Sequence, residues 1–252
     1  MPEKTPPGTA GIAVIIPAKD EARRISATVR AALKLPGADL VMVVDDGSAD
    51  ATAELAERAG ARVVRHARNR GKAAAMETGA EAVRLLDTHD GVPSRHLLFL
   101  DADLAETAQD AAPLVEPVLK GEADMTIAVF SSLVKLGGHG FVVRLSRDGI
   151  RRATGWSATQ PLNGQRCLTR AAFEAARPLA AGFGVETALT IDLLRKGFRL
   201  KEVEVPLSHR ATGTDLNAQL HRARQFRDVA RALATRDPAV RDRLGRFRAR
   251  AL

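Results

Sequence analysis

Short apolar runs alternate with alanine-rich amphipathic segments along the first half of the chain. Each run is apolar at consecutive positions, which is typical of strands covered on both faces, as in parallel sheets. The pattern predicts strands over residues 11–16, 40–44, 61–64, 96–100 and 125–130, and helices over about 21–34, 50–59, 72–86 and 108–120. This alternation predicts an α/β fold, with a doubly wound, mostly parallel sheet and helices on both faces.

The pattern changes after residue 130, where polarity is mixed and glycines are frequent up to residue 164. We expect loops around a helix over 142–153, followed by a helix over 185–196, a strand over 198–205 and a final basic helix. The organisation we predict is a disordered lead-in over 1–10, a single domain over 11–215 with halves 11–130 and 131–215, and a basic helical tail over 216–252.

Composition is ordinary for a globular protein, with 45% hydrophobic and 27% charged residues in 252. The single cysteine, Cys167, excludes an internal disulfide framework and fits a reducing compartment. The first residues lack the pattern of a signal peptide, and no apolar run approaches the roughly 20 residues of a membrane span. We therefore expect a cytoplasmic protein.

Basic residues are concentrated near the C-terminus, and the formal net charge is +8. Ten arginines lie between Arg222 and Arg250. Such a tail suits anionic partners, including acidic lipid head groups, so peripheral contact with a membrane is one interpretation and a solvated helical face is the other. One tryptophan and no tyrosine leave few platforms for stacking bases, which argues against a nucleic-acid partner.

Carboxylates follow two of the predicted strands. Asp45 and Asp46 end one, and Asp101 and Asp103 follow another. Ligands of open α/β sheets bind at the carboxyl ends of the strands. In an extended backbone residues i and i+2 point the same way, so Asp101 and Asp103 are candidates to hold Mg²⁺ or Mn²⁺ together with phosphate oxygens. The alternative is a loop whose aspartates cap helices.

Lys72 lies at the predicted start of a helix, where a cation and the helix N-terminus together suit a phosphate. The spacing of a Walker A loop is missing, and no G-x-G-x-x-G follows the first strand. These absences argue against a P-loop nucleotidase and against a dinucleotide-dependent dehydrogenase.

Four segments, IPAKDE, VVDDGSADAT, NRGKAAAMETG and LFLDADL, resemble in order and placement the family 2 glycosyltransferases of the Rossmann-like GT-A fold. The resemblance implies an enzyme that binds a nucleotide sugar in residues 11–130 and its acceptor in residues 131–215. It also implies Mg²⁺ or Mn²⁺ as cofactor, with Asp103 as a ligand. The nucleotide-sugar contacts that it implies are Pro17, Ala18, Glu21, Asp46, Gly47, Lys72, Asp101 and Ala102.

The segment GFGVET resembles a segment of the glucosyl-3-phosphoglycerate synthases, which implies that Glu186 contacts the donor sugar. We take Glu186 and Asp101 as the candidate catalytic residues, and the same resemblance implies His209 as a second metal ligand. Arg144 and Arg166 are candidates to bind a phosphorylated acceptor through paired N–H contacts, or are surface charges. The glycine-rich loop 136–141 departs from the acceptor motif of those synthases, so the acceptor stays open.

The function that we predict is metal-dependent transfer of a sugar, with UDP-glucose as the favoured donor, to a phosphorylated small molecule or a lipid phosphate. One alternative is an inverting polyprenyl-phosphate sugar transferase at the membrane surface. Another is a sugar-phosphate nucleotidyltransferase, although the Gly- and Arg-rich loop expected after its first strand is missing. The sequence leaves open the stereochemistry and whether the chain forms a homodimer.

Overall fold

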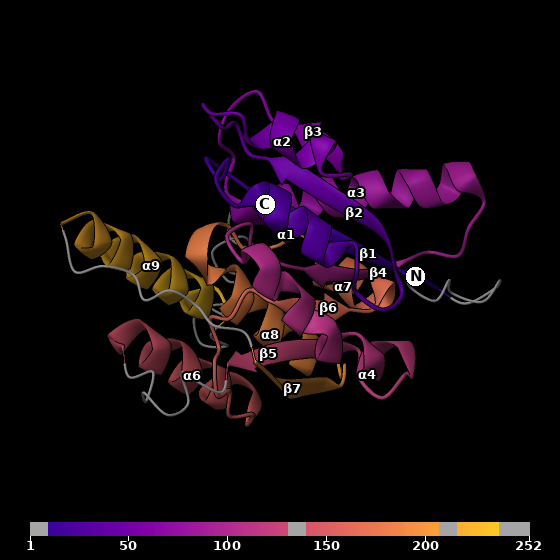
Figure 1. Cartoon of the computed structure of the whole chain (residues 1–252). Helices are drawn as coiled ribbons and strands as arrows, with labels where there is room; N and C mark the ends of the chain where they lie inside the picture. The colour runs from indigo at the N-terminus through magenta and orange to yellow at the C-terminus, as the bar shows by residue number, and fades with distance from the viewer. Residues whose placement is uncertain (1–9, 131–139, 207–215, 237–252) are drawn as a thin grey trace, which may run out of the picture.

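The computed structural model describes residues 10–130, 140–206 and 216–236. Its strands form one sheet in the order β3-β2-β1-β4-β6-β5-β7 (Figure 1). Only β6 runs antiparallel to its neighbours in this sheet, so the mostly parallel sheet predicted from the sequence is confirmed. The strands are β1 (Ile12–Ala18), β2 (Ala38–Asp45), β3 (Arg62–Arg65), β4 (His96–Phe99), β5 (Met125–Phe130), β6 (Arg166–Leu168) and β7 (Leu200–Val205).

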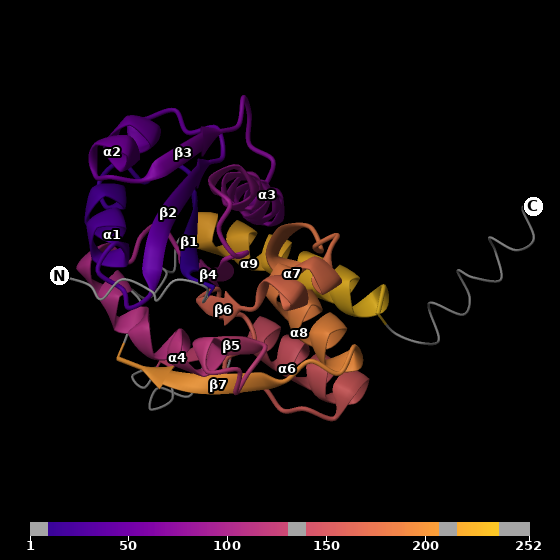
Figure 2. The same cartoon turned by 90° about the vertical axis from the view of Figure 1, so that its right-hand side faces the viewer.

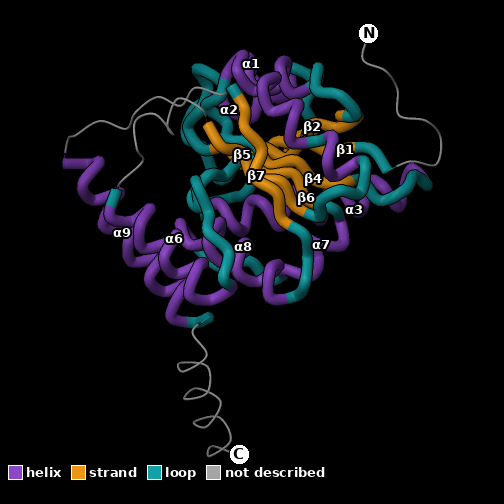
Figure 3. Tube along the Cα trace, turned by 90° about the horizontal axis from the view of Figure 1, so that it is seen from below, coloured by secondary structure: helices purple, strands orange, loops and turns teal. Residues whose placement is uncertain are grey.

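Helices cover both faces of the sheet, as Figures 2 and 3 show. Side chains of β1 alternate between the two cores, because successive residues of a strand point to opposite faces. Ile12, Val14 and Ile16 join the core under α1 (Ile25–Ala32), α2 (Thr52–Arg58), the 3₁₀ helix η1 (Ala105–Leu114) and α4 (Glu116–Leu119). Ala13 and Ile15 join the core under α3 (Lys72–Asp90), α7 (Arg170–Ala176) and α8 (Val185–Arg195). Because helices cover both faces of the sheet, consecutive residues of a strand are all buried, which explains the unbroken apolar runs in the sequence.

The helix predicted over 108–120 was wrong in kind and in bounds. The chain instead forms η1 from Ala105 and then the short α4, with Pro113 inside η1 and Pro117 in the first turn of α4. Proline has no backbone N–H to donate and its ring crowds the preceding turn, which interrupts a regular α-helix.

Three of the described elements were not predicted: β6, α7 and the short 3₁₀ helix η2 (Gly182–Gly184). The strand β6 has three residues, too few for a periodic pattern. Thr169 then begins α7, because its side chain accepts a hydrogen bond from the backbone N–H of Ala172 at 3.1 Å. A threonine in this position is a common helix start, and it is the signal that sequence reasoning passed over.

The final helix α9 (Leu216–Ala234) packs against α6 (Phe141–Thr154) and α8. Val229 and Ala232 are buried, and Leu233 packs on Ile150 and Ile191. Gly149 makes room for this contact, since a Cβ there would lie 2.3 Å from the Leu233 side chain. The described part of the predicted tail is thus packed onto the body of the domain. None of the described helices has both the length and the apolar character needed to cross a bilayer.

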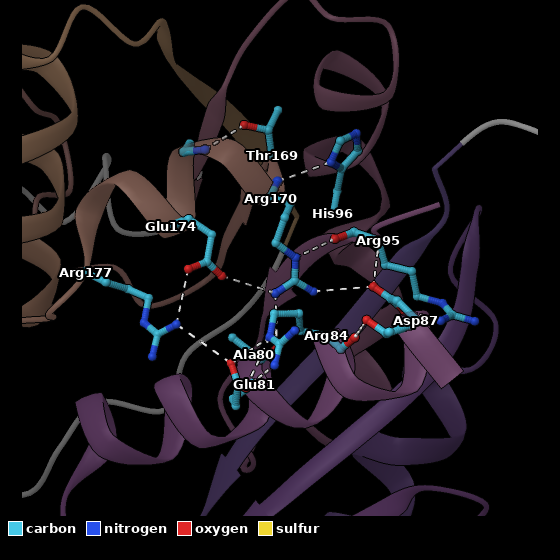
Figure 4. Close-up of polar contacts among 12 residues, drawn as sticks. Ala80, Glu81, Arg84, Asp87, Arg95, His96, Thr169, Arg170, Glu174 and Arg177 are labelled. Atoms are coloured by element: carbon cyan, nitrogen blue, oxygen red, sulfur yellow. Dashed lines mark hydrogen bonds and ion pairs between the residues drawn. The ribbon is translucent and has the colours of Figure 1, made fainter. Parts of the chain in front are cut away.

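A network of buried charges joins α3, β4 and α7 at the amino end of β4 (Figure 4). Arg170 donates from Nη1 to the carbonyl of Ala80 at 3.0 Å, and its Nη2 lies 3.7 Å from Asp87 Oδ2. Asp87 also accepts from the backbone N–H of Arg95 at 2.9 Å and pairs with the Arg95 guanidinium. Asp87 thereby balances two nearly buried arginines.

Candidate active site

The strand ends bring the predicted site residues together at one edge of the sheet. β2, β1 and β4 are parallel neighbours, so their carboxyl ends meet there. Pro17 and Ala18 are the last residues of β1, and the backbone N–H of Asp46 donates to the Ala18 carbonyl at 2.8 Å. Asp101 lies two residues beyond β4. Sequence reasoning therefore located this edge correctly.

The loops after β1 and β2 hold each other in place. The backbone N–H of Asp20 donates to Ser48 Oγ at 2.9 Å, and that of Glu21 donates to Thr52 Oγ1 at 2.8 Å. Gly47 has φ +73°, and a Cβ there would lie 2.7 Å from the backbone of Arg68. Glycine is required at this position, and Ser48 and Thr52 fix the loop that carries Glu21.

Asp46 organises the loop that precedes α3. Its Oδ1 accepts from His66 Nδ1 at 2.7 Å and from the Arg70 N–H at 2.8 Å, and its Oδ2 accepts from the Gly71 N–H at 2.7 Å. Burial tends to raise the pKa of Asp46, but these donors outweigh it and the pKa is lowered. Asp46 is therefore an ionised anchor for the start of α3, and its contact with a nucleotide stays a prediction.

Lys72 joins two carboxylates that are distant in sequence. Its Nζ lies 2.8 Å from Asp101 Oδ1 and 3.1 Å from Glu186 Oε1. Lys72 is the first residue of α3, and Glu186 is a nearly buried residue in the first turn of α8. Burial alone would lower the pKa of Lys72, but the two carboxylates outweigh it and raise the pKa above its ordinary value. The centre of the site is thus an ammonium held between two acids.

Two contributors to this cluster were not singled out from the sequence. Gln165 Nε2 donates to Asp101 Oδ2 at 2.6 Å. Gly164 lies against the same pair, since a Cβ there would be 2.4 Å from Lys72 Nζ. The available signal was the Asn163-Gly164 dipeptide before an apolar Cys167-Leu168, which is typical of a turn that enters a strand.

Asp103 pairs with a different cation from the one that Asp101 contacts. Its Oδ2 lies 3.5 Å from Arg24 Nη1, whose guanidinium also lies 3.8 Å from Glu21 Oε2. The extended backbone predicted from Asp101 to Asp103 was wrong, because the chain turns at Ala102 and Asp103. That the two carboxylates hold one metal ion stays a prediction. The Ala102 carbonyl accepts from Thr28 Oγ1 at 2.8 Å, which helps to fix the turn.

The charges of this corner suit a cation. Partial burial raises the pKa of Glu21, and neighbouring Asp103 adds to the rise. Among the described residues, Glu21, Asp101, Asp103 and Glu186 give four carboxyl groups, and Lys72 and Arg24 are the cations that the structure pairs with them. Hard divalent cations prefer such oxygen ligands together with phosphates.

A complete metal-binding set is not found within residues 10–130, 140–206 and 216–236, where no three acidic, histidine or cysteine side chains cluster closely enough. His209, the other predicted ligand, lies outside the described residues. Metal binding by Asp103 therefore stays a prediction.

The two predicted acceptor arginines differ in position. Arg144 is exposed on α6. Arg166 is buried and donates to the carbonyls of Asn163 at 2.8 Å, Glu186 at 3.1 Å and Pro161 at 3.0 Å. Burial lowers the pKa of Arg166 to about 10. A direct acceptor contact does not fit this burial, so Arg166 is a brace that links the 161–163 turn to the backbone of Glu186.

The mostly parallel sheet, with its acidic loops at the carboxyl ends, defines an α/β protein of the glycosyltransferase GT-A type. Residues 13–155 match the model of glycosyl transferase family 2, which is more than half of the chain. The chain belongs to this family, and it is an enzyme of the glycosyltransferase class, as the sequence resemblance implied.

The chain is also similar to proteins that are named as glycosyltransferases or sugar-transferring synthases. Glycosyltransferase AglJ of Haloferax volcanii is 30% identical over 218 residues, which cover 84% of this chain and 67% of that protein. Glucosyl-3-phosphoglycerate synthase of Mycobacterium tuberculosis, in complex with Mn²⁺, UDP and phosphoglyceric acid, superposes with a TM-score of 0.72 at 25% identity, over 90% of this chain and 78% of that one. A complex of that synthase with Mn²⁺, UDP-glucose and phosphoglyceric acid gives 0.69 at 26% identity, over 90% and 79%.

Proposed function

We propose that this protein is a metal-dependent glycosyltransferase that takes glucose from UDP-glucose and transfers it to a phosphorylated small molecule. The observation that carries the proposal is Lys72, which lies between Asp101 and Glu186 at the carboxyl edge of the sheet. Complexes of the mycobacterial synthase with Mn²⁺, UDP-glucose and phosphoglyceric acid support the choice of donor, metal and acceptor class.

The side chains divide the work as follows. Lys72, at the N-terminus of α3, offers an ammonium and backbone N–H groups to the diphosphate, and so stabilises charge that develops on the leaving group. Glu186, held by Lys72 and by the Arg166 brace, orients the donor sugar. Asp103 would hold Mg²⁺ or Mn²⁺, which supplies further neutralisation of the diphosphate.

Donor binding must change the partners of Lys72. Its charge is shared by two carboxylates, Asp101 and Glu186. A diphosphate would compete for the same ammonium and free one carboxylate to accept hydrogen bonds from sugar hydroxyls. This exchange couples recognition of the phosphate to recognition of the sugar.

Thermal unfolding with UDP, GDP, CDP or dTDP, each with and without Mn²⁺, tests the donor and the metal together. A ligand that binds only the folded protein raises the melting temperature. We expect a shift with UDP that needs Mn²⁺ and that is lost in Asp103→Ala. Asp110→Ala, which changes a partly exposed residue of η1, is the matched control and should keep the shift. An equal shift without Mn²⁺, or none with any nucleotide, would refute the proposal.

A lipid-phosphate acceptor is the second candidate, and an exposed aromatic pair favours it. Phe141 of α6 is 66% exposed and Phe226 of α9 is 38% exposed, and their rings stack with centroids 5.4 Å apart. Arg144 lies three residues along α6 from Phe141, on the same side of the helix. Apolar side chains beside a cation suit the boundary between lipid tails and phosphate head groups.

Vesicle co-sedimentation separates the two acceptor classes. If lipid is bound, the protein should sediment with phosphatidylglycerol vesicles, less with phosphatidylcholine vesicles, and much less after Phe141→Ala. Leu85→Ala, which removes another exposed apolar side chain, is the control. Equal behaviour of the wild type and Phe141→Ala would leave the small-molecule acceptor as the proposal. The predicted cytoplasmic location and homodimer stay predictions.

A further inference from the structure

Gln165 lies at the edge of the sheet where the site is built, because β6 runs antiparallel to its neighbours. The start of an antiparallel strand lies beside the carboxyl ends of the strands that flank it. Arg166 pairs with Phe99 of β4 and with Ile127 of β5. The residue before Arg166 is therefore next to the loop that carries Asp101.

The backbone of Gln165 is fixed on both sides. Its N–H donates to Asn163 Oδ1 at 2.9 Å, and its carbonyl accepts from the Ala128 N–H at 3.0 Å. The residue is 1% exposed, so its side chain has no free rotamer to adopt in water. The amide that donates to Asp101 is consequently held in place by the fold itself.

The carboxylate of Asp101 is bound at both oxygens by donors of different kinds. Lys72 Nζ lies 2.8 Å from Oδ1, and Gln165 Nε2 donates to Oδ2 at 2.6 Å. A second donor fixes the plane of the carboxylate, which one ammonium cannot do. Gly164 leaves the space for this arrangement, since a Cβ there would lie within 3.1–3.3 Å of the Asp101 oxygens.

We propose that Gln165 is a positioning residue that orients the Asp101 carboxylate for the donor sugar nucleotide. The inference rests on the proposed function, because it assumes that Asp101 faces the donor. It adds a contributor from the second half of the chain to a site whose other parts come mainly from the strand ends of the first half.

The neutral charge of Gln165 is part of its role. Glu21, Asp103 and Glu186 add to the negative charge near Asp101, and Lys72 and Arg24 pair with members of this group within the described residues. An amide donates a hydrogen bond without adding to this excess. A glutamate at this position would place a second carboxylate oxygen against Asp101 Oδ2 in place of the N–H donor, and it would add one negative charge. Gln165→Glu should therefore weaken binding of UDP-glucose more than Gln165→Met does.

The test is a double-mutant cycle read by calorimetry of UDP-glucose binding with Mn²⁺. Gln165→Met should weaken binding roughly tenfold, from the loss of a hydrogen bond to a charged group. In an Asp101→Asn background the same substitution should weaken it by no more than about threefold, because the charged partner is gone. Gln165→Glu should weaken wild-type binding by more than Gln165→Met does, and it keeps the test available if the methionine variant does not fold.

Gln160→Met is the matched control. Gln160 lies five residues before Gln165 and bridges the backbone N–H and carbonyl of Phe130, and its Oε1 also accepts from Asn163 Nδ2 at 3.3 Å. It should lower the melting temperature without changing affinity by more than about twofold. The inference is overturned if Gln165→Met binds UDP-glucose like the wild type, or loses the same factor in both backgrounds. Failure of the wild type to bind any nucleotide sugar would instead overturn the proposed function, and this inference with it.

Discussion

Replacing Lys72 by methionine tests whether the bridge between Asp101 and Glu186 also stabilises the fold. Removing one member of a fully buried ion pair costs about 3–5 kcal/mol, whereas an exposed pair contributes at most about 1. Glu186 is 8% exposed, but the side chains of Lys72 and Asp101 are 32% and 26% exposed. We therefore expect a loss of about 2 kcal/mol, which lowers the melting temperature of a chain of this size by roughly 4–8 °C.

The pH range of this effect follows from the direction of the shift. The pKa of Lys72 is raised above its ordinary 10.5 in the folded protein, so its stabilisation is fully present below that pH and is lost only as the pH rises through the folded value. Calorimetric unfolding at pH 7 and pH 9 should give the same loss for Lys72→Met.

Lys120→Met is the control for the loss of a lysine. Lys120 pairs with Glu116 in an exposed position, where water and salt screen the charges, so Lys120→Met should leave the melting temperature close to that of the wild type. If Lys72→Met unfolds at the wild-type temperature, the bridge does not stabilise the fold and the reasoning is refuted.

Three further substitutions probe other parts of the structure. Gly47→Ala should lower the free energy of unfolding, measured by chemical denaturation, by about 2 kcal/mol or more, because it adds strain at positive φ and overlap with the Arg68 backbone. Gly91→Ala, at φ +64° with open space around it, should lose only the part that comes from strain. Equal losses for the two variants would contradict the overlap. Asp87→Ala should cost about 2 kcal/mol in the same assay, because two nearly buried arginines each lose one of two carboxylate partners, Arg95 keeping Asp39 and Arg170 keeping Glu174. Exposed Asp90→Ala should be near neutral. The pKa of Asp46 is lowered in the folded protein, so the stabilisation from its carboxylate is present above the ordinary pKa of 3.8 and is lost as the pH falls through the pKa of the folded protein. Asp46→Asn should therefore reduce the difference in the free energy of unfolding between pH 6 and pH 3. An unchanged difference would contradict the role of Asp46 as an anchor.

The first half of the fold could be predicted because its strands are covered on both faces. Residues such as Ile15 and Ile16 pack into opposite cores, so both positions must be apolar and the run is unbroken. The carboxyl ends of those strands then indicated the position of the site, and Lys72 and Asp101 do meet there. Family membership, fold and enzyme class were confirmed on this basis.

The remainder depends on contacts that no local pattern encodes. Gln165 reaches Asp101 only because β6 pairs antiparallel with β4, a strand that lies more than 60 residues earlier in the chain. Arg166 could not be distinguished from a surface arginine, since its partners are backbone carbonyls from Pro161 to Glu186. The turn after Asp101 was missed because the extended backbone of β4 was assumed to continue to Asp103, whereas the strand ends at Phe99.

We propose that the protein transfers glucose from UDP-glucose at the site formed by Lys72, Asp101 and Glu186. The most direct measurement is mass spectrometry of the products formed from UDP-glucose and Mn²⁺ with either phosphoglyceric acid or a polyprenyl phosphate as acceptor. The account predicts a glucosylated acceptor and free UDP with the wild type, and a fall of at least about tenfold with Lys72→Met, since one charged contact to a leaving group contributes on the order of 1.5–3 kcal/mol. A wild-type protein that binds UDP-glucose but glucosylates neither acceptor, or a Lys72→Met variant as active as the wild type, would contradict it.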